Sequence, residues 1–261
     1  MILFRHELRR GRTAWIIWTA AISLMLAASI LLFPEIASQT EQINEMFSQM
    51  GSFTSAFGMD RLNFGTVTGY YAVECGNTFG LGGAFFAAML AAAMLSKEEK
   101  ERTAEFLLAH PISRTRIVLE KLMAVYAQVV AMNAVIFAVS VGSVAVIGEQ
   151  VPWKEIALLC LAYLLLQLEI ASLCFGVSAF VAKGAAGIGI GIAVFMYFLN
   201  IIGNITDRAK FLKYITPYGY CDGADIVASG GLDLAKISVG FVFAAAGVAA
   251  AFIKYRKKDI S

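Results

Sequence analysis

Charge is the first thing that this sequence has little of. Of its 261 residues only 15% are Asp, Glu, Lys or Arg, against about 25% in soluble domains. Histidine occurs only at His6 and His110, and none of the four cysteines belongs to a CxxC pair. The phosphate-binding motif GxxxxGKS/T and the zinc motif HExxH are both missing. These absences exclude a P-loop ATPase and an intramembrane zinc protease, so we predict that the chain is not an enzyme by itself and binds no cofactor directly.

Apolar residues make up 59% of the chain, and they are gathered into long runs. A helix that crosses a bilayer core of about 30 Å needs about 20 such residues. We therefore predict an all-α, polytopic membrane protein with six transmembrane helices in a single domain, 1–261. No small-residue cleavage site follows the first run, so it is expected to be a retained helix rather than a signal peptide. The predicted spans are about 13–34, 75–96, 117–148, 154–182, 184–206 and 234–253.

The basic residues predict the orientation of the chain. Most of the 21 Lys and Arg residues fall in segments that share one side of the membrane with both termini, which we therefore expect to be cytoplasmic. Residues 1–12 predict an amphipathic helix on the membrane surface. Residues 35–68 predict an external segment with one amphipathic helix and an irregular return, and 206–233 an irregular external loop with aromatic residues at the membrane interface. Cys75 and Cys221 both fall near the external face, and a disulfide between them is left open.

A charged segment, EEKERTAEFLLAH at 98–110, separates the second and third spans. Its pattern predicts a helix with one apolar and one charged face. Phe106 falls near the charged side, where a large aromatic ring gains little unless a partner covers it. Pro111 cannot continue this helix, and Ser113 is a suitable N-cap for the next one. The segment is interpreted as a docking helix for a cytoplasmic partner, with a solvated linker helix as the alternative.

Few polar residues lie within the predicted spans, and Glu169 is the most notable because it falls near the middle of the fourth. A charge there costs a few kcal/mol, so the carboxyl is expected to face a cavity, to pair, or to be protonated. A substrate or ion path and a neutral hydrogen bond to a neighbouring helix both stay open. Asn133 and Asn200 are further candidates for the translocation path. The GxxxG pair Gly187 and Gly191 predicts a close helix contact, either within the chain or between subunits.

The charged segment and the residues after it resemble the cytoplasmic segment between spans 2 and 3 of ABC-2-type transporter permeases. There the pattern is ExxxGTxExLLxxPxSR, with a Lys several residues on. Arg102 stands where Gly is usual, which lets the helix run unbroken. The six spans, the basic opening helix and the cytoplasmic termini resemble the family over the whole chain. The matching residues are Glu98, Thr103, Glu105, Leu107, Leu108, Pro111, Ser113, Arg114 and Lys121.

This resemblance implies the permease subunit of an ABC exporter, in which 98–110 is the coupling helix. It further implies a cytosolic ABC ATPase subunit that carries the ATP, a second permease subunit in a homodimer, and a place in a bacterial plasma membrane. The cargo is not specified, and nucleic acid is not an expected partner. The residues implied in ATPase coupling are Glu98, Glu101, Arg102, Glu105, Phe106, Leu107, Leu108, Pro111 and Arg114.

The alternative function is an ion- or proton-coupled secondary carrier that needs no ATPase and uses Glu169 as its protonated group. Such carriers are commonly built from inverted repeats with polar sites near the bilayer midplane. This sequence has no recognisable repeat between its halves and few intramembrane charges. The permease is therefore the favoured hypothesis.

Overall fold

The computed structural model describes residues 2–97, 112–181 and 185–257, and every regular element in these ranges is a helix. Six helical segments are long and apolar enough to cross a membrane, which confirms the prediction of an all-α protein with six spans. They are Ile2–Ser38, Val67–Ala93, Arg114–Val146, Trp153–Ser178, Ala185–Ile205 and Leu234–Lys257.

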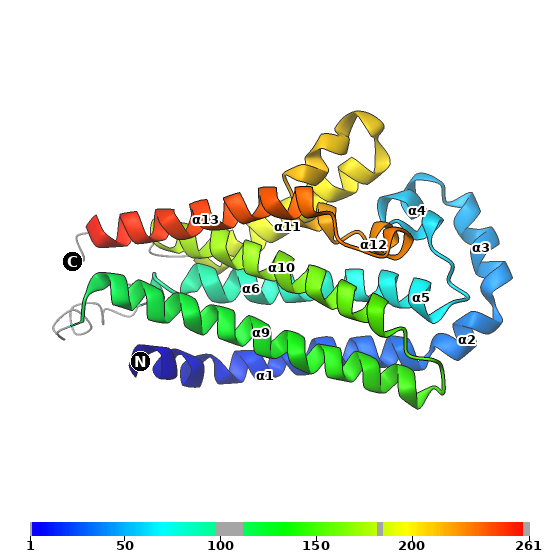
Figure 1. Cartoon of the computed structure of the whole chain (residues 1–261), viewed down its shortest axis with the longest axis horizontal. Helices are drawn as coiled ribbons and strands as arrows, with labels where there is room; N and C mark the ends of the chain where they lie inside the picture. Colours follow the sequence, from blue (N-terminus) through cyan, green and yellow to red (C-terminus); the bar gives the residue numbers. More distant parts are fainter. Residues whose placement is uncertain (1, 98–111, 182–184, 258–261) are drawn as a thin grey trace.

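The long helices run side by side along the longest axis of the molecule (Figure 1). Helix α10 (Trp153–Ser178) is at the centre and packs against α6 (Leu81–Ala93), α9 (Arg114–Val146) and α13 (Leu234–Lys257). Helix α1 (Ile2–Leu31) packs mainly on α9, and α11 (Ala185–Ile205) packs mainly on α6. The most apolar stretch of α10 is 61% buried and that of α13 only 11%, so the outer helices present large apolar surfaces.

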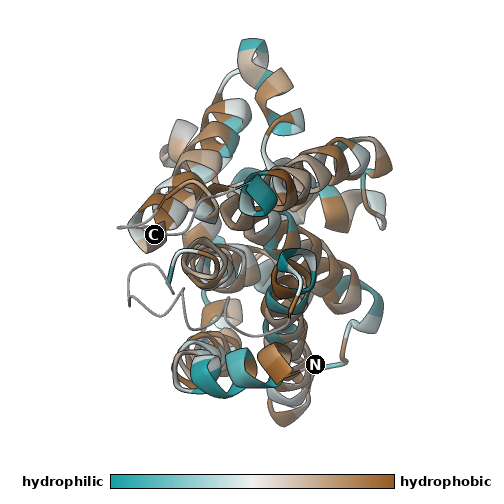
Figure 2. Cartoon of the chain, turned by 90° about the vertical axis from the view of Figure 1, so that its left-hand side faces the viewer, coloured by the Kyte–Doolittle hydropathy of each residue, from teal (hydrophilic) through white to brown (hydrophobic). Residues whose placement is uncertain are grey.

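Both termini lie at one end of the bundle, which we call the termini end, and the opposite end is called the loop end (Figure 1). Hydrophobic residues predominate along the long helices, as the brown stretches of the ribbon in Figure 2 show. Leu24 of α1, Phe195 of α11 and Phe241 of α13 are 72%, 59% and 72% exposed. Lipid can cover such an apolar surface. The backbone needs no water there, because each helix satisfies its own backbone hydrogen bonds.

The predicted surface helix 1–12 is helical, but it is not a separate element. Helix α1 continues from Ile2 to Leu31 without a break, because no residue in that stretch interrupts the backbone hydrogen bonds. Pro34 lies in the first turn of the short helix α2 (Phe33–Ser38), where a missing N–H is tolerated. Trp15 of α1 donates its indole N–H to the carbonyl of Gln128 on α9, at 2.9 Å.

The predicted external segment 35–68 is more helical than expected. After α2 it forms α3 (Thr40–Gln49), α4 (Ser52–Ala56) and a 3₁₀ turn, η1 (Met59–Arg61). The second span then begins at Val67 with α5 (Val67–Glu74), ahead of the predicted residue 75. A close backbone contact explains this early start, because a Cβ atom on Gly69 would lie 2.2 Å from the carbonyl oxygen of Asn63. Glycine at this position lets the chain fold back directly into the helix.

A π-helix, η2 (Cys75–Gly80), joins α5 to α6 within the second span. Such turns are rare and occur often at functional sites. Here the wider turn lies against α10, where the carbonyl of Phe79 accepts a hydrogen bond from Gln167 Nε2 at 3.5 Å.

The loop predicted over 206–233 is more helical and more buried than expected. It forms η3 (Asp207–Tyr214), η4 (Pro217–Tyr220) and α12 (Gly223–Ser229), and its residues 216–222 are buried. Neighbouring helices satisfy several of its polar groups: Tyr163 donates to the carbonyl of Cys221 at 3.2 Å, and Thr216 Oγ1 donates to the carbonyl of Met196 at 2.7 Å. Non-helical backbone is tolerated at membrane depth when protein surrounds it in this way. Cys75 and Cys221 are both buried free thiols, so the disulfide left open by the sequence is not formed.

The contact between α10 and α13 depends on glycine. A Cβ atom on Gly176 of α10 would lie 2.6 Å from the carbonyl oxygen of Gly247 on α13, closer than side-chain atoms approach. We expect Gly176→Ala to force the two helices apart and to destabilise the protein by about 1–3 kcal/mol. Gly142→Ala on α9 is the matched control, since nothing lies within 4 Å of that position. Thermal unfolding of the purified variants measures the difference, and equal Tm values would contradict this account of the contact.

Candidate functional site

Most of the residues expected to couple the chain to an ATPase fall in 98–111, outside the described residues. They are Glu98, Glu101, Arg102, Glu105, Phe106, Leu107, Leu108 and Pro111. Arg114 is described, and it is the first residue of α9. Its guanidinium donates to the carbonyls of Tyr255 and Arg256 in the last turn of α13, at 3.4 and 3.3 Å. Ser113 caps α9 by accepting the Arg116 N–H at 3.3 Å, which confirms the predicted N-cap.

A buried charged cluster lies at the termini end, directly before residue 98. This Glu7 cluster consists of Glu7 on α1, Lys97 after α6 and Lys121 on α9. The Glu7 carboxylate pairs with Lys97, and it lies 3.3 Å from the Nζ of Lys121. Lys121 Nζ also donates to the carbonyl of Met94 at 2.7 Å, and its side chain is fully buried. The cluster therefore joins α1 to the chain on both sides of 98–111.

Asn133 lies between helices rather than in a cavity. Its amide donates to Gln167 Oε1 on α10 at 2.7 Å and to the carbonyl of Val129 on its own helix at 2.8 Å. Because Gln167 also reaches Phe79 on η2, these amides link the second, third and fourth spans. In apolar surroundings such hydrogen bonds hold helices together.

Glu169 lies on the other side of α10, toward α13. Its Oε2 accepts a hydrogen bond from the hydroxyl of Tyr220 on η4 at 2.9 Å, and the residue is 4% exposed. A Cβ atom on Gly240 of α13 would lie 2.2 Å from the same Oε2, so this carboxyl requires a glycine opposite it. The carboxyl bonds a neighbouring segment and also lines a cleft, so both alternatives from the sequence stay open.

Asn200 on α11 lines a separate small cavity of about 60 Å³ near the loop end, together with Asn77, Asn204 and Tyr218. The Oδ1 atoms of Asn200 and Asn204 and the hydroxyl of Tyr218 are buried without a hydrogen-bond partner among the described residues. A polar cavity of this size has room for water. Asn133, Glu169 and Asn200 do not line a common cavity in the described part of the chain.

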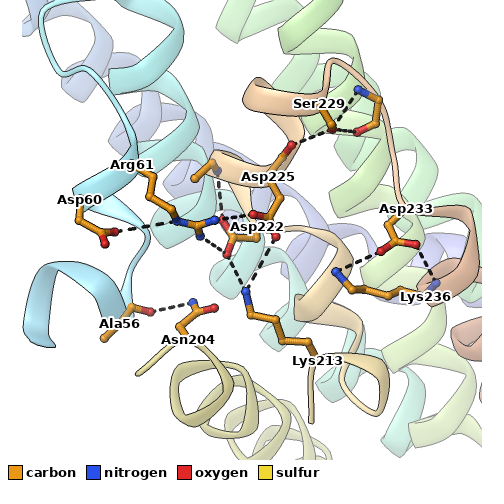
Figure 3. Close-up of polar contacts among 12 residues, drawn as sticks. Ala56, Asp60, Arg61, Asn204, Lys213, Asp222, Asp225, Ser229, Asp233 and Lys236 are labelled. Atoms are coloured by element: carbon orange, nitrogen blue, oxygen red, sulfur yellow. Dashed lines mark hydrogen bonds and ion pairs between the residues drawn. The ribbon is translucent and has the colours of Figure 1, made fainter. Parts of the chain in front are cut away.

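A second charged cluster is located at the loop end (Figure 3). This Asp222 cluster consists of Arg61, Lys213, Asp222 and Asp225. Asp222 Oδ2 lies 2.8 Å from Arg61 Nη2 and 3.3 Å from Lys213 Nζ, and Asp225 pairs with both basic residues. Oδ1 of Asp222 also accepts the N–H of Ala224 and so caps α12. The cluster ties the segment between the first two spans to the segment between the last two.

Two opposing effects act on the pKa of Asp222. Burial disfavours the charged carboxylate and would raise the pKa, but Arg61 and Lys213 outweigh it and hold the pKa below its usual 3.8. For Arg61, burial acts to lower the pKa, and the two carboxylates raise it above its usual value. Asp222 and Arg61 are therefore both charged at neutral pH.

The sequence model of a family described as ABC-2 family transporter protein matches residues 1–259. The chain belongs to this family. The match extends over almost the full length and bears out the resemblance drawn from the charged segment. No match to an individual curated protein was found.

As an ABC-2 family transporter protein, the chain is a multi-pass membrane component of a transport system and is not catalytic by itself. Sequence reasoning missed both charged clusters of this ABC-2 protein, since it treated Lys97, Arg61 and Lys213 only as orientation signals. One signal was available for the first cluster: Glu7 is the only acidic residue among the basic ones at the start of the chain.

The Asp222 cluster leads to a prediction for stability. Asp222→Asn keeps the size of the side chain and the helix cap but removes the charge, and we expect it to destabilise the protein by about 2 kcal/mol at pH 7. Because the folded pKa lies below 3.8, this contribution is present at and above about pH 4 and is lost as the pH falls further. The Tm gap between the variant and the unaltered protein should therefore narrow below pH 4.

The matched control is Asp233→Asn. Asp233 pairs with Lys236 at 3.1 Å, but its side chain is 40% exposed, so water screens the pair. We expect a Tm change near zero for this variant. An Asp222→Asn effect no larger than that of the control would contradict a stabilising role for the buried carboxylate.

Proposed function

We propose that this ABC-2 protein is the permease subunit of an ABC exporter in a bacterial plasma membrane. A separate cytosolic ATPase binds the ATP and acts on the coupling segment 98–110, and two copies of the permease form the translocation path. The family match supports the class of transporter. The Glu7 cluster is the observation in the structure that best supports energy transfer at this segment.

The contacts beside the segment show how a displacement would spread. Lys97 at its start is held by Glu7 of α1, and Lys121 on α9 is held by the same carboxylate and by Met94. Arg114, just after it, contacts the last carbonyls of α13. A push on 98–110 would therefore act on α1, α6, α9 and α13 together. A two-state rearrangement of packed helices can be driven from such a point.

The termini end carries the charge expected of a cytoplasmic face. Four arginines lie in the first turns of α1, at residues 5, 9, 10 and 12, and Lys254, Arg256 and Lys257 lie in the last turn of α13. Lys and Arg at the ends of spans favour the cytoplasmic side. In this orientation Lys97 and Arg114, the described residues on either side of 98–110, lie toward the cytosol, which supports contact of the segment with a cytosolic ATPase.

Pairing of two permeases is supported by the surface of α11. Gly187 and Gly191 are exposed, and nothing lies within 4 Å of either position. Gly189, between them, instead faces α6, where its Cβ atom would lie 2.7 Å from the carbonyl of Ala88. Among the described residues, therefore, nothing packs against the GxxxG pair. Bare pairs of this kind allow close helix contact in lipid, so α11 is the proposed place for the second copy.

The carrier alternative uses Glu169 as a protonated group and needs no partner. Its carboxyl is buried and has no basic partner among the described residues, which is the observation in its favour. Membership of the ABC-2 family favours the ATPase-driven permease instead.

Purification of the tagged chain from its native membrane tests the ATPase partnership. We expect an ABC-type ATPase to co-purify in equal amount. Phe106→Ala should weaken this association about thirtyfold, because truncating an aromatic anchor typically costs about 2 kcal/mol or more. Phe211→Ala is the control, since Phe211 is a 61% exposed aromatic residue at the loop end.

Two results would contradict the proposal. One is a Phe106→Ala chain that is correctly inserted and retains as much ATPase, and as much ATP hydrolysis, as the control. The other is gradient-driven transport by the purified chain alone that is lost in Glu169→Gln, which would establish the carrier alternative.

A further inference from the structure

A cleft of about 500 Å³ lies between α9, α10 and α13, with the Glu169 carboxyl in its wall. Its volume falls within the range of about 300–1,000 Å³ that is usual for ligand sites. Phe241, Ala245 and Ala249 of α13 line it and are exposed on the outside of the bundle. The cleft therefore opens between the two ends of the helices, on the side that faces lipid.

The depth of the carboxyl follows from its place in α10. Glu169 is about 24 Å along the helix from Trp153 and about 14 Å from Ser178, at a rise of 1.5 Å per residue. Apart from Glu169, the cleft is lined almost wholly by Leu, Ile, Val, Ala and Phe side chains, with three hydroxyl groups. A ligand that fills it must be largely apolar and must come from the hydrocarbon part of the bilayer.

The three hydroxyl groups of the cleft all donate their hydrogens within the protein, so none can donate a hydrogen bond to a ligand. Tyr220 donates to Glu169 Oε2 at 2.9 Å, and Ser172 donates to the carbonyl of Leu168 at 2.6 Å. The Tyr126 hydroxyl therefore donates to Ser172 Oγ, at 2.6 Å. Glu169 Oε1 has no hydrogen-bond or ion-pair partner among the described residues. The side chains of the cleft thus offer hydrogen-bond acceptors and one carboxyl group.

Among the described lining residues, the only side chain that can carry a charge at neutral pH is that of Glu169. No Lys or Arg is among its described lining residues, so a phosphate or carboxylate on a ligand would find no counter-charge. An ionised Glu169 at this depth is costly unless a cation pairs with it. An ammonium group satisfies both needs, because it is positive and carries only donors.

We propose that this cleft binds an amphiphile with an ammonium head and a single apolar chain, taken up from the lipid phase. The ammonium group pairs with Glu169, and the chain lies along the apolar wall of α13. Phospholipids with a zwitterionic head fit less well, since their phosphate would be left without a basic partner. The proposal deepens the proposed function by naming a ligand class. The binding proposal rests on the proposed transport function only in the claim that the bound amphiphile is the transported substrate.

The experiment measures binding to the chain alone, in phosphatidylcholine nanodiscs, after subtraction of binding to empty nanodiscs. Dodecylamine is the probe, because alkyl amines like that of Lys are protonated at pH 7. Dodecanol, with the same chain and no charge, is the matched neutral compound. We expect saturable binding of dodecylamine and at least tenfold weaker binding of dodecanol, as a charge-assisted hydrogen bond predicts.

Two variants locate the binding in the cleft. Glu169→Gln keeps the acceptor for Tyr220 but removes the charge, and should weaken dodecylamine binding about tenfold. Glu155→Gln removes a carboxylate from the same helix outside the cleft and should have no effect. Ala245→Trp fills the cleft from an exposed position and should abolish saturable binding, whereas Ala246→Trp, exposed but outside the lining, should not.

Circular dichroism and gel filtration establish whether each variant is folded. If Glu169→Gln does not fold, the comparison of Ala245→Trp with Ala246→Trp tests the proposal on its own. Binding that Ala245→Trp leaves intact, or equal binding of dodecylamine and dodecanol, would overturn the proposal. Because no ATPase takes part, this failure is distinct from a failure of ATPase association at 98–110.

Discussion

Helix α10 can occupy the centre of the bundle only because its neighbours have glycine where its polar side chains lie. A Cβ atom on Gly83 of α6 would be 2.1 Å from Gln167 Nε2, and one on Gly240 of α13 would be 2.2 Å from Glu169 Oε2. In lipid the hydrophobic effect does not drive helices together, so close packing and interhelical hydrogen bonds must do so. The glycines allow both at once, and the positions of α6 and α13 follow from this requirement.

The same constraint separates the two faces of α10. Gln167 joins Asn133 and the carbonyl of Phe79 in a buried network on one face. Glu169, two residues on, points toward α13 and Tyr220. Neighbouring polar residues on one helix therefore have different surroundings, one bonded on several sides and one lining an open cleft. This division lets Gln167 hold helices together while the Glu169 carboxyl lines the cleft.

Much of the fold was predictable, because its signals are local. The long apolar runs predict six spans, and Ser113 is a sound N-cap whatever surrounds it. The start of α5 at Val67 was missed, since it depends on the contact between Gly69 and Asn63 rather than on hydropathy. The burial of residues 216–222 was missed for a similar reason, because hydrogen bonds of Thr216 and Cys221 are made with residues of distant helices.

The candidate sites were less predictable than the fold. Glu169, Asn133 and Asn200 could be found because polar residues are rare in such spans. Their partners could not, since Tyr220 and Gln167 are brought to them only by the tertiary fold. The Glu7 cluster unites residues from α1, α9 and the segment after α6, and no spacing in the sequence marks such a set.

The π-helix at Cys75–Gly80 has a mechanical consequence for the second span. A π turn holds one residue more than an α turn, so the helix before it and the helix after it are offset by one position. Converting it to α geometry would rotate α6 relative to α5 by about 100° and shift it by about 1.5 Å along the axis. Such a conversion would therefore turn α6, which leads to Lys97, relative to α5, which lies beside α12 at the loop end.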